Sequence, residues 1–460
     1  MIKYWSANNL ANVRKVTKMK KLIISFLSIM TMMILFVPLV TVQAQPTFNV
    51  EAESAIIVDA NTGKILFEKN SDIKLPPASM TKMMTEYLVL EAIAEGKITW
   101  ETTTQISDYP YSISADATSS GIGLIQDKDY TVRELFEAMA IYSDNGTTIA
   151  LAELIAGSES EFVKMMNQKG EEMGLPEFKF VNSTGLANED LGENYPEGTS
   201  PDDDNLMSAR SAALLAYHLL NDYPEVLEFT SKTLGELDGR TLENWNWMLP
   251  WGEDDDRSIY GFEGVEGLKT GYTSAAGYCF TGTAKQGDRR IITVVMKTES
   301  EPARFIETKK LMEYGFSQFE QTELFPAGYQ TEDVSELPVS KGKDKTVEIA
   351  TQAALATMIR SGEEDLYSVK FQIDESKLDK DGKLAAPIEK GEKVGVATLQ
   401  YAGDSDLGYI QGNEQSQTVD LVTTKAVEKD NWFMLTLKAI GGFFSDIFSS
   451  IADFFKGLFS

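Results

Sequence analysis

The stretch Pro76-Pro77-Ala78-Ser79-Met80-Thr81-Lys82 leads into a run of helix-forming residues that ends before Gly96. Proline just before such a run and glycine just after it mark the two ends of a helix. Ser79 and Lys82 are three positions apart, so both side chains lie on one face of this helix. Backbone N–H groups at a helix start can stabilise an oxyanion, and a lysine with a depressed pKa can act as base for a serine. Ser79 is therefore a candidate nucleophile, although a simple helix cap would also explain it.

The Ser-x-x-Lys pattern is weak evidence by itself, because the chain contains it twice more. Ser71-Asp72-Ile73-Lys74 and Ser340-Lys341-Gly342-Lys343 also match, but both occur in polar segments typical of loops. Among these serines, only Ser79 stands at a predicted helix start. The sequence therefore favours Ser79 as the reactive serine.

The elements around this helix predict an α+β fold with helices framing an antiparallel sheet. Strands are expected at 55–59 and 64–68 about a turn at Asn61-Thr62-Gly63, and again within 277–297; helices are expected within 135–155 and at 208–220 and 302–314. Beyond about residue 320, short runs rich in β-branched residues alternate with Gly, Asp and Lys. These runs predict a small all-β domain at about 325–425.

Two more polar triplets carry chemistry if they lie beside Ser79. Ser143-Asp144-Asn145 opens a predicted helix, where it could also be an ordinary cap. Lys269-Thr270-Gly271 is expected to begin a strand after a glycine-rich segment, and it would supply a fixed positive charge, a hydroxyl and a place for close backbone approach. Taken alone, this second triplet is better explained as an ordinary strand start with an exposed lysine.

Composition excludes several classes of function. Against 42 Lys and Arg stand 70 Asp and Glu, a net charge of −28, so the protein repels nucleic acid. The single cysteine, Cys279, allows no intramolecular disulfide. The single histidine, His218, makes a zinc site improbable and is expected to be an ordinary helix residue.

Both ends of the chain indicate export and membrane contact. A basic stretch precedes an apolar run, Leu22 to Val40, and the small residues that end at Ala44 match a signal-peptidase site. An uncleaved membrane anchor is the alternative reading. From Trp432 onward, apolar residues recur at helical spacing opposite a small, polar face. This pattern is typical of a helix lying in a membrane interface, although a helix packed on the protein's own core, or an oligomerisation helix, would share it.

Taken in order, Ser79-x-x-Lys82, Ser143-x-Asn145 and Lys269-Thr270-Gly271 resemble the motifs of the penicillin-binding proteins and serine β-lactamases. Longer strings, PPASMTKMMT, LKTGYTSAAGYC and the residues Ala386-Pro387-Ile388, Lys390-Gly391 and Val394-Gly395, are similar to the low-molecular-weight D-alanyl-D-alanine carboxypeptidases. The resemblance implies a signal peptide at 1–44, a transpeptidase-like catalytic domain at 45–322, a β-rich domain at 323–428 and an amphipathic anchor at 429–460.

The resemblance also implies roles for single residues. Ser79 would attack the bond between two D-alanines, Lys82 would take its proton, Ser143 would relay a proton, and Asn145 would hold Lys82 and the substrate amide. Substrate would be bound by Lys269, Thr270, Gly271, Tyr272 and Arg304, with the backbone N–H groups of Ser79 and Tyr272 forming an oxyanion hole. No metal or cofactor is implied; the implied partners are peptidoglycan stem peptides, β-lactam antibiotics and the outer face of the cytoplasmic membrane.

Two other functions fit parts of the same pattern. A β-lactamase shares the three motifs, but its common type carries a glutamate followed closely by Leu-Asn, which the segment Asn188 to Asn194 does not match. A non-catalytic cell-wall-binding protein could keep the fold, but it would be expected to lose motif residues. The acidic, tryptophan-rich segment Asn221 to Gly264 is longer than the resemblance implies, and its place relative to the site is open.

Overall fold

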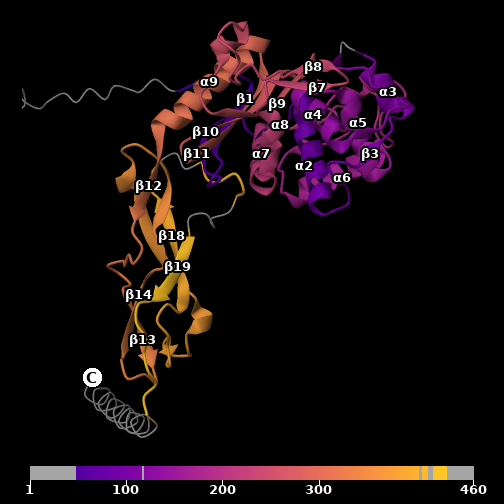
Figure 1. Ribbon diagram of the computed structural model, residues 1–460. Helices are drawn as coiled ribbons and strands as arrows, with labels where there is room; N and C mark the ends of the chain where they lie inside the picture. The colour runs from indigo at the N-terminus through magenta and orange to yellow at the C-terminus, as the bar shows by residue number, and fades with distance from the viewer. Residues whose placement is uncertain (1–47, 117–118, 404–406, 413–417, 432–460) are drawn as a thin grey trace, which may run out of the picture. The chain divides into compact units, whose positions relative to one another are not determined.

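The structure is a computed structural model of the 460-residue chain, and it describes residues 48–116, 119–403, 407–412 and 418–431. The predicted signal peptide lies outside these residues, as does the predicted C-terminal amphipathic helix except for its first three positions, 429–431. The described elements confirm the α+β prediction, with a helix-rich part that contains the three motifs and a β-rich part that follows it (Figure 1).

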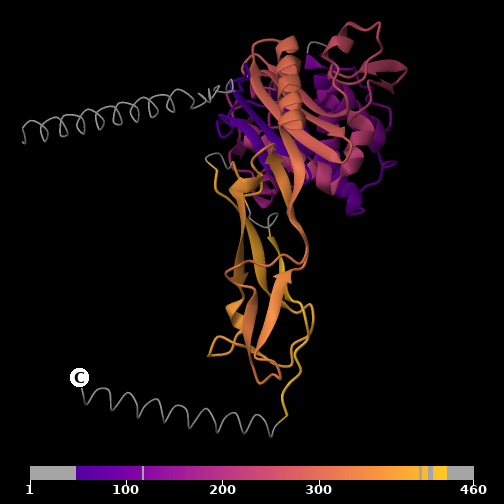
Figure 2. The ribbon, with the colours of Figure 1, turned by 90° about the vertical axis from the view of Figure 1, so that its left-hand side faces the viewer.

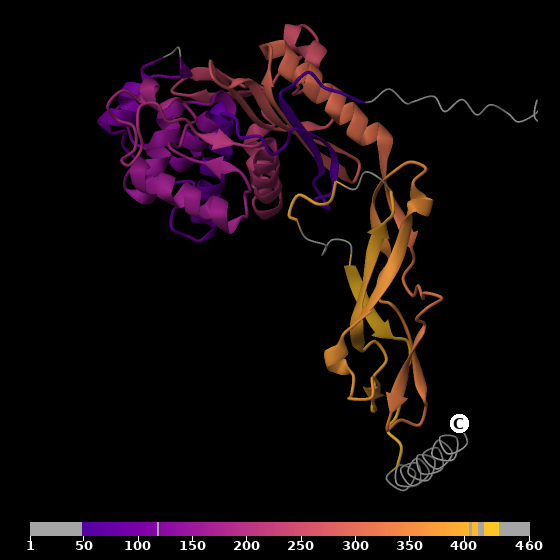
Figure 3. The same ribbon diagram turned by 180° about the vertical axis from the view of Figure 1, so that it is seen from behind.

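A five-stranded antiparallel sheet forms the centre of the first part, in the order β2-β1-β11-β10-β9. The strands are β1 (Ser54–Asp59), β2 (Ile65–Lys69), β9 (Val265–Thr273), β10 (Gly277–Gln286) and β11 (Arg289–Thr298). All six residues of β1 are buried, so both faces of the sheet are covered there. Helix α9 (Glu301–Gln318) lies along one face (Figure 2), and α7 (Ala209–Asp222) packs against the other (Figures 1 and 3).

The remaining helices gather beside the sheet around the main hydrophobic core. They are α2 (Lys82–Ala94), α3 (Asp108–Ser114), α4 (Val132–Tyr142), α5 (Asn145–Ala156), α6 (Glu159–Glu172) and α8 (Leu227–Thr230). Helix α2 is buried along most of its length, including the polar residues Lys82, Thr85 and Glu86. A helix that is surrounded on all sides belongs to the interior, so the motif lysine enters the core with it.

Short elements connect these helices. The two-stranded pairs are β3 (Thr103–Thr104) with β4 (Tyr130–Thr131), β5 (Phe178–Lys179) with β6 (Leu206–Met207), and β7 (Leu234–Leu237) with β8 (Arg240–Glu243). The 3-10 turns here are η1 (Ala78–Thr81), η3 (Asn188–Leu191), η4 (Pro224–Val226) and η5 (Asp256–Tyr260). The tryptophan-rich segment thus contains a hairpin and two short turns besides α8.

One strand boundary was predicted wrongly. Lys269 does not begin its strand, because β9 starts four residues earlier at Val265 and continues through Gly267 and Lys269. Glycines usually weaken a strand, which is why the preceding segment suggested a loop. Pairing with β10 along the whole of β9 outweighs that preference.

The β-rich part begins directly after α9. Its strands are β12 (Phe319–Phe325), β13 (Glu336–Ser340), β14 (Thr346–Thr351), β15 (Leu355–Arg360), β16 (Tyr367–Ile373), β17 (Leu384–Ala385), β18 (Lys393–Tyr401) and β19 (Thr418–Thr423), with the turns η6 (Glu364–Leu366) and η7 (Glu375–Lys377). Strand β12 pairs with β15, and the other six form one sheet, β16-β18-β19-β14-β13-β17. Strand β12 begins four residues before the domain boundary expected at 323.

Candidate active site

Ser79 lies in the 3-10 turn η1, immediately before α2. Its side chain does not cap the helix. Instead, the Lys82 Nζ atom lies 3.0 Å from the Ser79 Oγ atom. The turn and the helix therefore bring the hydroxyl and the amine of the motif into direct contact.

Lys82 is fully buried and surrounded by oxygen atoms. Besides Ser79 Oγ, its Nζ contacts Asn145 Oδ1 at 2.7 Å and the carbonyl oxygen of Thr184 at 2.8 Å. Burial, followed by the positive charge of Lys269, lowers the pKa of Lys82 well below its usual value. A depressed pKa is what a lysine needs in order to act as a base near neutral pH.

The second and third motifs meet each other at the same place. Lys269 Nζ on β9 donates to Ser143 Oγ at 2.8 Å, and Lys269 is 2% exposed. Ser143 ends helix α4 in a left-handed conformation, with φ 66°. Burial lowers the pKa of Lys269 to about 8. The pair joins the sheet to the junction between α4 and α5.

Asp144, between the two motif residues Ser143 and Asn145, has a structural function. Its carboxylate accepts from the backbone N–H of Thr147 at 2.6 Å, capping α5, and from that of Ile122 at 3.0 Å. Burial raises the pKa of Asp144 to about 6. The cap fixes the backbone between Ser143, which contacts Lys269, and Asn145, which contacts Lys82.

Gly271 on β9 lies too close to turn η1 to be replaced by a residue with a side chain. A Cβ atom placed there would lie 2.5 Å from the carbonyl oxygen of Pro77 and 3.2 Å from the backbone nitrogen of Ser79. The backbone that closely approaches Gly271 here is the protein's own turn η1. Any side chain at this position would push β9 away from Ser79.

Arg304 is a buried residue of α9, and its exposure of 2% excludes an ordinary surface ion pair. One guanidinium nitrogen pairs with Glu301 at 2.7 Å, and another donates to the Gly271 carbonyl oxygen at 3.4 Å. The Nε atom has no hydrogen-bond partner among the described residues. Burial lowers the pKa of Arg304 to about 10, so it remains a cation at neutral pH.

These groups surround one cavity of about 490 Å³. Seven of the nine predicted site residues line it, namely Ser79, Ser143, Asn145, Thr270, Gly271, Tyr272 and Arg304. Lys82 and Lys269 lie below the surface, where they contact Ser79 and Ser143. The structure therefore brings together all nine residues.

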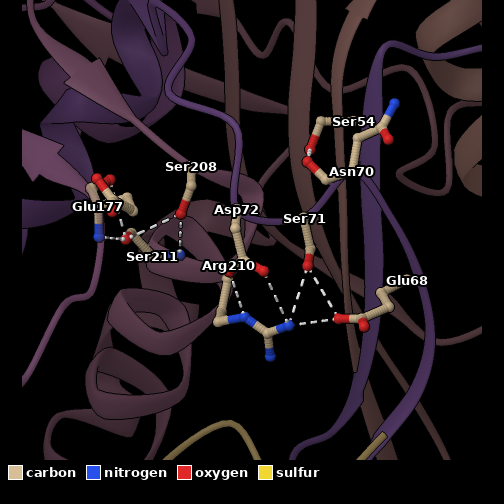
Figure 4. A network of polar contacts seen from close by, with 9 residues as sticks. All are labelled: Ser54, Glu68, Asn70, Ser71, Asp72, Glu177, Ser208, Arg210 and Ser211. Atoms are coloured by element: carbon tan, nitrogen blue, oxygen red, sulfur yellow. Dashed lines mark hydrogen bonds and ion pairs between the residues drawn. The ribbon is translucent and has the colours of Figure 1, made fainter.

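The two other Ser-x-x-Lys matches have structural contacts instead. The Ser71 hydroxyl contacts Glu68 and Arg210 in the network of Figure 4, and Lys74 pairs with Glu177 at 2.7 Å. In the third match, Lys343 pairs with Glu428 and not with its own serine. Neither lysine contacts the serine of its motif, in contrast to Lys82.

Sequence reasoning missed several residues that the site uses. The carbonyl of Thr184, which contacts Lys82, belongs to a turn in which the Asn182 side-chain oxygen accepts from two backbone N–H groups. The sequence Asn182 to Gly185 is a turn signal, but a turn signal does not reveal where its carbonyls point. Trp245 lines the cavity, with its Nε1 atom 2.9 Å from the Tyr142 carbonyl oxygen. The tryptophan-rich segment thus contributes to the wall of the site.

Comparison with known proteins gives consistent matches over nearly all the described chain. The family model of D-alanyl-D-alanine carboxypeptidases matches residues 40–300, and that of the penicillin-binding protein 5 C-terminal domain matches residues 319–429. The D-alanyl-D-alanine carboxypeptidase DacF of Bacillus subtilis is 35% identical over 77% of this chain and 82% of its own length. DacA of Haemophilus influenzae is 30% identical over 77% of this chain and 82% of its own length.

Two solved structures confirm the expected fold of a transpeptidase-like domain followed by a β domain. PBP3 from Streptococcus pneumoniae, described as a peptidoglycan synthesis regulatory factor, is 37% identical with a TM-score of 0.67, covering 82% of this chain and 100% of that one. Penicillin-binding protein 5 from Haemophilus influenzae is 28% identical with a TM-score of 0.64, covering 83% and 99%. The matched motifs, the fold and the two family models together show that this chain belongs to the D-alanyl-D-alanine carboxypeptidase family of low-molecular-weight penicillin-binding proteins.

Proposed function

We propose that this serine-type carboxypeptidase removes the terminal D-alanine from peptidoglycan stem peptides through an acyl-enzyme on Ser79. The observation that carries the proposal is the contact of Lys82 Nζ with Ser79 Oγ inside a buried pocket of oxygen atoms. The family identity supplies the reaction, and the geometry suggests which residue performs each step.

The surroundings of Lys82 suit a neutral amine acting as a base. The Asn145 side-chain oxygen and the Thr184 carbonyl can only accept hydrogen bonds, so they bind the two hydrogens of a neutral amine. Its lone pair then faces the Ser79 hydroxyl. Lys82 takes the hydroxyl proton as Ser79 attacks the carbonyl between the two D-alanines.

The later steps use the neighbouring groups. The oxyanion is assigned to the backbone N–H groups of Ser79 and Tyr272, because edge strand β9 lies against η1 at Gly271. Ser143, held by Lys269, is placed to pass a proton to the leaving D-alanine nitrogen. Water then attacks the acyl-enzyme and frees Ser79.

Arg304 is proposed to bind the terminal carboxylate of the substrate. Its guanidinium lines the cavity, remains charged and retains an unpartnered Nε–H among the described residues. Guanidinium groups match carboxylates well in charge and shape. A peptide whose C-terminus is amidated should therefore be a poor substrate.

The test is D-alanine release by the full chain from a peptide ending in D-Ala-D-Ala, with the C-terminally amidated peptide and the Ser79→Ala protein as controls. Release from the free acid by the native protein, and none by the variant, supports the proposal. Equal release by native and variant proteins would exclude Ser79 as the nucleophile. No release by either would favour a non-catalytic binding protein.

β-Lactam antibiotics are expected to acylate Ser79 in the same way. A β-lactamase would release the hydrolysed antibiotic rapidly, whereas a carboxypeptidase should keep it as a long-lived ester. Asp190 on η3 is an acidic group that lines the cavity, although its segment lacks the glutamate followed by Leu-Asn of the common β-lactamases. The lifetime of the penicillin adduct, followed by intact-protein mass spectrometry, distinguishes the two activities.

The place of action is proposed to be the outer face of the cytoplasmic membrane. The family acts on the cell wall, which agrees with an exported protein. Among the described residues, no helix combines the length and apolar character required to cross a bilayer. The apolar stripe at 443–459 supports peripheral attachment instead. Sedimentation of the full chain with lipid vesicles, against a form that ends at Asn431, would test this attachment; equal sedimentation would contradict it.

A further inference from the structure

Glu86 is a buried carboxyl group that no step of the proposed reaction uses. It follows Lys82 by four positions on α2, so the two side chains lie on the same side of the helix. Its exposure is 0%, and neither of its carboxylate oxygens has a hydrogen-bond partner among the described residues. Buried Glu159, in contrast, accepts from the Ser183 backbone and hydroxyl and from Tyr109.

A buried carboxylate without hydrogen bonds is unstable unless a nearby positive charge compensates it. Burial raises the pKa of Glu86 to about 7, while the charges of Lys269 and then Lys82 act in the opposite direction. The two lysines of the active site are therefore the groups that stabilise the ionised form of Glu86. The same attraction acts in reverse and favours a proton on each lysine.

Charged groups on neighbouring elements do not replace Glu86 as the carboxylate that depends on the two lysines. Asp144 at the start of α5 and Glu159 at the start of α6 both favour a proton on Lys82, but each has its own hydrogen-bond donors. Arg304 on α9 disfavours a proton on Lys269. Glu86 differs from both acids because it has no such donors.

Three charged residues of the other helices packed on α2 have partners of their own. On α7, Arg210 pairs with Asp72, and Asp222 accepts from Tyr87. On α4, Glu137 pairs with Lys232. These groups are therefore compensated by partners outside the site.

We propose that Glu86 is a positioning residue for the amine pair Lys82 and Lys269, and that its unpartnered carboxyl sets how many protons the pair carries. The proposal rests on the roles proposed above for the two lysines. With Lys82 neutral, Lys269 protonated and Glu86 ionised, the three groups together carry no net charge. Acylation requires a neutral Lys82 beside a protonated Lys269, and Glu86 sets the pH range in which both conditions hold.

The test is the pH dependence of acylation by benzylpenicillin, measured on the full chain by intact-protein mass spectrometry for the native protein and Glu86→Gln. Without the carboxylate, a proton on either lysine is less stable. Both limbs of the bell-shaped profile should therefore move to lower pH, by about one pH unit. A purely structural role would lower the rate at every pH and leave the limbs in place.

Two further variants make the result specific. Glu86→Asp keeps the negative charge and should keep both limbs near their native positions. Asp59→Asn is the matched control, because Asp59 is a buried carboxyl with one unpartnered oxygen outside the site, and its profile should coincide with the native one. If Glu86→Gln does not fold, Glu86→Met provides the same measurement, since its apolar side chain needs no hydrogen bond when buried.

Limbs at the native positions in a folded, acylating Glu86→Gln or Glu86→Met protein would overturn the inference. A shift of equal size in Asp59→Asn would overturn it as well, because the effect would then not belong to the site. Failure of the native protein to form any penicillin adduct would instead refute the proposed function. The two failures are thus distinguishable in one set of experiments.

Discussion

Two segments only a few residues apart contain the same pattern, Ser71 to Lys74 and Ser79 to Lys82, and they differ in how their charges are compensated. Around Ser71, Arg210 pairs with Glu68 and Asp72 (Figure 4), and Lys74 pairs with Glu177. Around Ser79, Lys82 and Lys269 contact neutral oxygens. A lysine beside a carboxylate remains protonated, whereas one buried among neutral groups can lose its proton. Direct contact with a carboxylate, and not the motif, therefore distinguishes Lys74 from Lys82.

The largest contrast is expected for the two serines. Ser79→Ala should reduce the rate of penicillin acylation to about one part in 10⁴ of the native rate or less, because no other nucleophile takes its place. Ser71→Ala, measured in parallel, should leave this rate within about twofold, since Ser71 only joins an ion-pair network. Comparable losses of acylation rate in both variants would contradict the distinction between a reactive Ser79 and a structural Ser71.

The lysines should differ next. Lys82→Met removes the base and should lower kcat/KM for D-alanine release by about 10³-fold. Lys74→Met breaks an ion pair whose side chains are 47% and 43% exposed, so kcat/KM should not change and the protein should lose at most about 1 kcal/mol of stability. Steady-state kinetics and urea unfolding of the two variants measure both quantities. A Lys82→Met protein with more than a tenth of native kcat/KM would contradict the role of this amine.

The free energy of unfolding should depend on pH through the titration of Lys269. Its pKa is about 8 in the folded protein and about 10.5 when exposed, so between these values the unfolded chain binds more protons. Raising the pH through this window should therefore increase the free energy of unfolding, by on the order of 3 kcal/mol from this group. About 2 kcal/mol of this increase falls between pH 8 and pH 10. Urea unfolding at these two pH values should show it in the native protein and in Lys74→Met, and a smaller increase in Lys269→Met. The same increase in Lys269→Met would show that Lys269 is not the group responsible.

Arg304 and Arg210 should differ by a smaller factor in kcat/KM. Arg304→Gln should lower kcat/KM for a free-acid peptide by about 10- to 100-fold, the loss expected for a charged hydrogen bond. The same variant should leave kcat/KM for the C-terminally amidated peptide unchanged. Arg210→Gln should alter neither value, because Arg210 contacts Glu68, Ser71 and Asp72 away from the cavity. Equal losses on both peptides for Arg304→Gln would refute carboxylate recognition.

The sequence predicted the members of the site better than their surroundings. Ser79, Lys82 and Lys269 could be found because the sequence shows directly which side chains the motifs contain and in what order the motifs occur. The Thr184 carbonyl could not, because every residue has a carbonyl and only the fold directs this one to Lys82. Glu86 was equally hidden, since an acidic residue in a helix is normally exposed.

In the fold too, features set by nearby residues were predicted, and features set by contacts between distant residues were missed. Prolines and a glycine placed the start and end of the helix after Ser79 almost correctly. The start of β9 was missed, because pairing with a distant strand overrides the weak strand preference of its glycines. The reason for Gly271 was also missed, since its close neighbour Pro77 is nearly two hundred positions earlier in the chain.

The central claim is tested most directly by locating the penicillin adduct on the native chain. Tryptic cleavage places the competing serines on separate peptides, Asn70 to Lys74 and Leu75 to Lys82, and the second contains Ser79 as its only serine. Peptide mass spectrometry after acylation should find the added mass on Leu75 to Lys82 alone. Finding it on Asn70 to Lys74, or on any peptide without Ser79, would contradict the account.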